Sequence, residues 1–105
     1  MNRSIYNTYS RRTRLALAII ASTIMVLDNT TTIFAISHGA HEINPIVKLF
    51  LSSTPSWILF TAVKMAIAFA LTYMFVKTKI DLIIWLAVMA FFINAIITNL
   101  VNAFA

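Results

Sequence analysis

Three apolar runs of more than 20 residues, in a chain of only 105, constrain this protein more than any other feature. They lie at about 15–37, 56–76 and 82–104, and a helix crosses a bilayer with about 20 mostly apolar residues. Hydrophobic residues make up 61% of the chain and charged ones 10%, and a soluble domain this short could not bury so much apolar surface. The sequence therefore predicts one all-α integral membrane domain over residues 1–105 with three transmembrane helices.

A cleaved signal peptide is the alternative for the first run, because basic residues precede it. The run continues beyond signal-peptide length, and no small-x-small cleavage site leads from it into a polar chain. We therefore expect the first run to remain as a transmembrane span.

The connection between the first two spans predicts a short extra helix. Gly39 is placed to cap the first span, and Asn44-Pro45 matches a helix N-cap followed by proline at the first helical position. Residues 45–53 are too few to cross a bilayer, so we expect an interfacial or re-entrant helix there. The second span then begins at Pro55, and a short turn makes the second and third spans an antiparallel hairpin.

The positions of Lys and Arg predict the orientation of the chain in the membrane. Most of them fall before the first span or between the second and third, on one side of a three-span protein: Arg3, Arg11, Arg12, Arg14, Lys77 and Lys79. The opposite loop holds only Lys48. We expect a multi-pass protein of the cell membrane with a cytoplasmic N-terminus and an outer C-terminus. The basic residues do not form one solvated patch, so a nucleic-acid partner is not expected.

Asp28 and Lys64 are the two ionisable residues placed deep within the apolar runs. Counted at 1.5 Å per residue, both lie roughly 13 Å from the outer end of their spans, which predicts an ion pair between two helices. Asn94 comes to a similar depth on the third span, so we expect it to hydrogen-bond near the pair, with Asn99 pointing elsewhere. The expected polar cluster comprises Asp28, Thr31, Thr32, Glu42, Asn44, Lys64, Asn94 and Asn99.

Two functions remain open for this cluster. Hydroxyl, amide and charged groups can hold helices together within a bundle or against another subunit. An intramembrane charge is also a functional-site hypothesis by default, so the Asp28–Lys64 pair could belong to an autonomous transporter or a proton or ion conduit.

A third function, metal-assisted catalysis, would rest on the loop residues His38, His41 and Glu42, since imidazole and carboxylate groups bind zinc or copper. Their order differs from the His-Glu-x-x-His zinc motif, and the chain holds no cysteine. One glycine cannot build a phosphate-binding loop. We expect no catalytic residue and, apart from lipid, no cofactor bound by this chain.

The succession Asp28, Thr31-Thr32, Gly39, Glu42-Ile43-Asn44-Pro45 and Lys64 resembles a family of small archaeal and bacterial membrane proteins of unknown function. The resemblance runs from about residue 15 onward, and Asn94 or Asn99 matches the family's last position. It implies a bundle of three or four spans and no known activity.

In size and layout the chain is similar to accessory subunits of large membrane enzymes. The extra small subunits of the archaeal ammonia monooxygenase are one such group, and the copper ligands of those enzymes belong to other subunits. We therefore expect a non-catalytic accessory or structural subunit of a membrane complex. Its expected partners are the lipid bilayer and other membrane subunits or further copies of itself.

Overall fold

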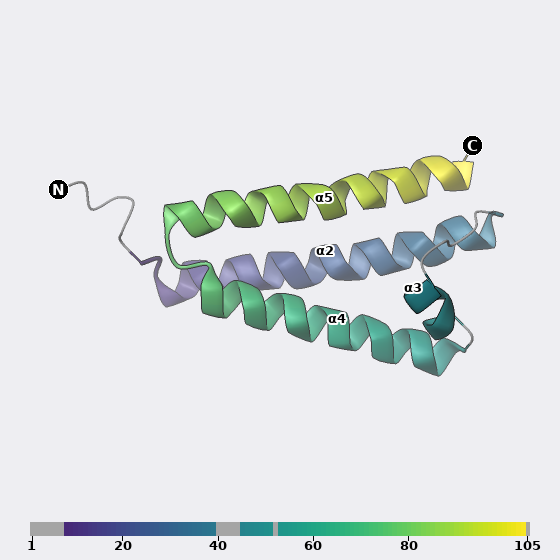
Figure 1. Ribbon diagram of the computed structural model, residues 1–105, viewed down its shortest axis with the longest axis horizontal. Coiled ribbons are helices and arrows are strands. Elements are labelled where there is room, and N and C mark those ends of the chain that lie inside the picture. Colours follow the sequence, from purple (N-terminus) through teal and green to yellow (C-terminus); the bar gives the residue numbers. More distant parts are fainter. Residues whose placement is uncertain (1–7, 40–44, 52, 105) are drawn as a thin grey trace.

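The structure, a computed structural model, describes residues 8–39, 45–51 and 53–104. These residues form four helices and no strand: α2 (Arg11–Ser37), α3 (Pro45–Phe50), α4 (Thr54–Phe75) and α5 (Lys79–Phe104) (Figure 1). Three of them, α2, α4 and α5, are long and apolar enough to cross a membrane. The predicted fold class, three spans with a short helix after the first, is confirmed.

Side chains that the sequence places at the helix starts determine where the helices begin. Ser10 accepts a hydrogen bond from Thr13 N at the start of α2, and Ser53 accepts one from Ser56 N at the start of α4. At α5, Asp81 Oδ2 accepts from Thr78 N at 3.0 Å while Asp81 N donates to Thr78 Oγ1 at 3.4 Å, which forms a capping box.

The helix ends confirm the predicted glycine cap of the first span and correct the end of the short helix. The C-cap of α2 is His38, and Gly39 follows it with a φ of +100°, the left-handed conformation that favours glycine. The short helix ends at Phe50 instead of residue 53, because Ser53 already caps α4. The expected N-cap Asn44 lies outside the described residues.

Helix α2 lies at the centre of the molecule and packs along both α4 and α5. It supplies most of the buried residues, and Ala18 and Ala21 are completely buried. Small side chains allow membrane helices to approach closely. Met25 and Met89 extend this contact toward α5. The core is therefore a seam along α2, with α4 and α5 attached to either side of it.

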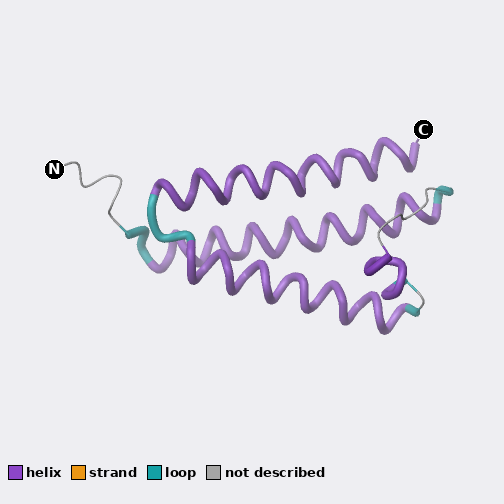
Figure 2. Tube along the Cα trace, in the orientation of Figure 1, coloured by secondary structure: helices purple, strands orange, loops and turns teal. Residues whose placement is uncertain are grey.

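The other two long helices hardly contact one another. They leave their shared turn at Lys77 and Thr78 and diverge on either side of α2 (Figure 2). The short helix α3 packs against the N-terminal part of α4, where the rings of Phe50 and Phe60 stack with centroids 4.8 Å apart. An open space along the molecule, bordered by α4 and α5, follows from this arrangement.

Candidate functional site

The ion pair expected from depth is present between α2 and α4. Lys64 Nζ lies 2.6 Å from Asp28 Oδ2, and the side chains of Lys64 and Asp28 are 21% and 13% exposed. Both charged side chains are therefore largely buried, and each compensates the charge of the other. In a bilayer each alone would cost about 2.5–3.5 kcal/mol on insertion scales.

Asn29 completes this contact, and reasoning from the sequence did not single it out. Its Oδ1 accepts a second hydrogen bond from Lys64 Nζ at 2.8 Å, and its Nδ2 donates to Thr61 Oγ1 at 2.8 Å. Asn29 is 2% exposed. Its position next to Asp28 in an apolar run was the available signal, because neighbouring helix positions are 100° apart and both can face the same partner helix.

Asn99, and not Asn94, joins α5 to the cluster, which corrects the expectation from depth. Asn99 Nδ2 lies 3.1 Å from Thr31 Oγ1 and 3.0 Å from Thr32 Oγ1. The two threonine hydroxyls in turn donate to backbone carbonyls of α2, including that of Asp28. Asn94 is exposed on the surface of α5.

The rotation of α5 explains this difference. One side of α5 faces the rest of the bundle, and its residues are partly or fully buried: Trp85, Met89, Phe92, Asn99 and Ala103. Successive members of this set are three, four or seven residues apart, which keeps them on one side of the helix. Asn94 is five residues from Asn99, so the two side chains are separated by about 140° around the helix. Depth alone could not reveal which of them faced α2.

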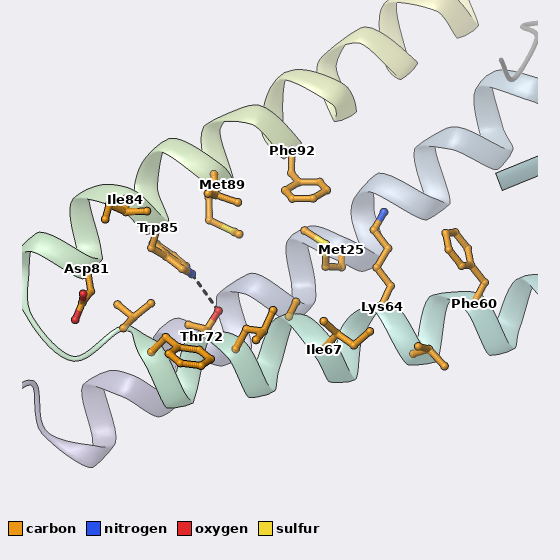
Figure 3. Close-up of a pocket in the computed structure, with 16 residues that line it drawn as sticks. Met25, Phe60, Lys64, Ile67, Thr72, Asp81, Ile84, Trp85, Met89 and Phe92 are labelled. Carbon is orange, nitrogen blue, oxygen red and sulfur yellow. Dashed lines mark hydrogen bonds between the residues drawn. The ribbon is translucent and has the colours of Figure 1, made fainter. Parts of the chain in front are cut away.

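A groove of about 640 Å³ opens between α4 and α5, with Met25 of α2 at its base (Figure 3). Its lining is almost wholly apolar, and Lys64 enters it with its Nζ 5.9 Å from the ring centre of Phe60 and 5.5 Å from that of Phe92. Near the turn, Trp85 Nε1 donates to Thr72 Oγ1 at 3.1 Å and links the two walls. The groove is therefore narrowed near the turn and open along the helices.

Polar contacts at the two ends of α2 lie outside this cluster. Arg14 donates from both Nε, at 3.0 Å, and Nη2 to the carbonyl oxygen of Tyr73 in the last turn of α4. Its guanidinium also lies 4.6 Å from the centre of the Tyr73 ring. Last-turn carbonyls lack partners within their own helix, so Arg14 caps α4 from a neighbouring helix.

Of the three candidate metal ligands, only His38 lies within the described residues; His41 and Glu42 lie outside them. The Nδ1 of His38 is 2.8 Å from the carbonyl oxygen of Phe34, and the His38 and Phe34 ring centres are 4.3 Å apart. Among the described residues no group of three metal-binding side chains occurs. His38 thus packs against Phe34 at the end of α2.

Every buried side-chain polar atom in the described part of the chain has a hydrogen-bond partner. The described residues of the cluster therefore join three helices, and their buried polar atoms are all paired. Comparison of the chain with protein-family models, with curated proteins and with solved structures found no match. Any function has to be argued from the contacts themselves.

Proposed function

We propose that this protein is a non-catalytic structural or accessory subunit of a larger membrane complex. One observation carries the proposal. Lys64 Nζ donates two hydrogen bonds within the chain, to Asp28 Oδ2 and to Asn29 Oδ1. A group used in this way fixes the position of α4 against α2. Asn99 does the same for α5 against α2. The polar cluster thus holds a defined arrangement of three helices that other membrane proteins can contact.

The same contacts favour this role over a proton or ion conduit. A conduit requires titratable or hydrated groups that continue from the centre of the membrane toward both surfaces. Within the described spans, Asp28 and Lys64 are the ionisable residues at the centre, and apolar side chains line the groove beside Lys64. We further propose a location in the cell membrane with a cytoplasmic N-terminus, from the distribution of Lys and Arg.

The archaeal ammonia monooxygenase is the first complex to search for, because the chain is similar in size and layout to its accessory subunits. In that proposal copper stays in the other subunits, and this chain contributes helix surface only. The large exposed residues of α4 and α5, among them Leu59, Ile67, Ile83 and Phe91, are suited to lipid or to partner helices.

Purification in mild detergent from the native membrane tests the proposal. We expect the chain to co-purify in fixed stoichiometry with larger membrane subunits, and to show no ion or proton flux after reconstitution alone in liposomes. A chain that purifies without other subunits and conducts in liposomes, with conduction lost in Asp28→Asn, would establish the conduit instead. Thr30→Val is the matched control, since Thr30 is exposed on α2 and lies outside the ion pair.

A further inference from the structure

The face of α5 turned away from α2 carries polar side chains where a lipid-facing helix would be apolar. Six exposed residues follow one another at alternating spacings of three and four along this face: Ile84, Ala87, Phe91, Asn94, Thr98 and Val101. Such spacing forms a continuous seam along one side of a helix. Asn94 and Thr98 occupy adjacent positions of the seam in the central and outer part of the span.

Neither of these two side chains has a hydrogen-bond partner among the described residues. Asn94 lies two residues from Phe92, whose ring contacts the ammonium of Lys64, so its depth is close to that of the central ion pair. An amide left without a partner in an apolar medium is strongly unfavourable. Asparagine and threonine in membrane helices relieve that cost by bonding to another helix.

We propose that this seam binds the same seam of a second copy of the chain, through a parallel pair of α5 helices. Copies inserted with one orientation are related by a two-fold axis along the membrane normal, so each residue meets its own equivalent at the same depth. An asparagine amide is both donor and acceptor, so Asn94 pairs with Asn94 of the second copy without any other group. Thr98 is self-complementary for the same reason.

The spacing indicates that the occupant is a helix. Residues repeating at three and four suit two helices that cross at about 20°, the commonest geometry in membrane bundles. Asn94 then acts as a polar residue within an otherwise apolar seam, which fixes register and the number of helices. The groove between α4 and α5 meets this seam only at Ile84, and its other lining residues on α5 lie outside the seam. The inference goes beyond the proposed function and does not depend on it.

Disulfide cross-linking tests the pair directly, because the chain contains no cysteine. The chain is expressed alone in a foreign host, and isolated membranes are oxidised. Val101→Cys places a thiol on the seam, and Ile93→Cys places one on an exposed flank of the same helix; the native side chains are 60% and 45% exposed. We expect a cross-linked species of twice the 11.8 kDa monomer for Val101→Cys, at least about fivefold more abundant than for Ile93→Cys.

A second variant separates the seam from the fold. Asn94→Leu with Thr98→Val, added to Val101→Cys, should reduce cross-linking at least about fivefold while circular dichroism and thermal unfolding in detergent stay unchanged. Equal cross-linking at positions 93 and 101, or no reduction in the combined variant, would overturn the proposal. So would cross-linking of Val101→Cys to a different protein, and not to a second copy, in native membranes.

Discussion

Asp28 and Lys64 form an ion pair in which each compensates the charge of the other. Without its partner, either charge would be unpaired in the membrane. We expect Asp28→Asn and Lys64→Met to lower the free energy of unfolding by about 3–5 kcal/mol each, since either change strands a largely buried partner. The double variant should lose much less than the sum of the two. Thermal unfolding in detergent measures all three, and a double variant that shows strict additivity would refute the coupling.

Asn99 and Asn94 provide a matched test of how α5 is rotated. Asn99→Leu removes the hydrogen bonds to Thr31 and Thr32 and should lower the free energy of unfolding by about 1–2 kcal/mol. Asn94→Leu places an apolar side chain on an exposed face and should leave the unfolding of the monomer unchanged within about 0.5 kcal/mol. The comparison is made by thermal unfolding in dilute detergent. A reversed order of the two effects would require α5 to be turned by about 140°.

These residues also mark how far the sequence could predict the site. Counting residues from the span ends was enough to pair Asp28 with Lys64, because rise per residue is constant along a helix. The same count could not choose between Asn94 and Asn99, since it contains no information on rotation. The sequence did not predict the role of Asn29, because that role depends on the hydroxyl of Thr61 on another helix.

Among the helices, α2 carries interactions that neither α4 nor α5 could replace. Its alanines permit close approach, and its polar residues reach both neighbours. The apolar runs alone predicted three spans, because lipid requires helices whose backbone groups are satisfied internally. They did not predict that α2 would lie centrally, although its span has the lowest mean hydropathy of the three. The sequence also did not predict which polar residues of α5 are exposed, because that depends on which face of the helix is buried against α2.

Arg14 joins the start of α2 to the end of α4, and Arg12 offers a control for it. Arg14→Gln removes the cap on the Tyr73 carbonyl, so the last turn of α4 should open more often. We expect backbone amides at the end of α4 to exchange with deuterium about fivefold faster, which corresponds to about 1 kcal/mol. Arg12→Gln removes the same charge from an exposed position and should leave that exchange unchanged. Faster exchange in both variants would point to loss of charge and not of the cap.

For the molecule as a whole, the distribution of basic residues predicts its orientation. Thr13→Cys lies near the start of α2, and Thr54→Cys lies at the start of α4; both native residues are exposed. In intact cells, a thiol reagent that does not cross membranes should label the cysteine at 54 and not the one at 13. Opened cells should allow both to be labelled. Labelling of position 13 in intact cells would invert the orientation.

The central position of α2 has a consequence for the biosynthesis of the protein. Asp28 precedes Lys64 by 36 residues, which at ribosomal rates of 5–20 residues per second is an interval of about 2–7 s. For that time α2 holds a carboxylate whose counter-charge has not yet been synthesised. Both later spans pack against α2, so the nascent chain gains the ion pair between α2 and α4 only when α4 emerges. Lateral release of a finished three-helix unit can only follow the arrival of Lys64.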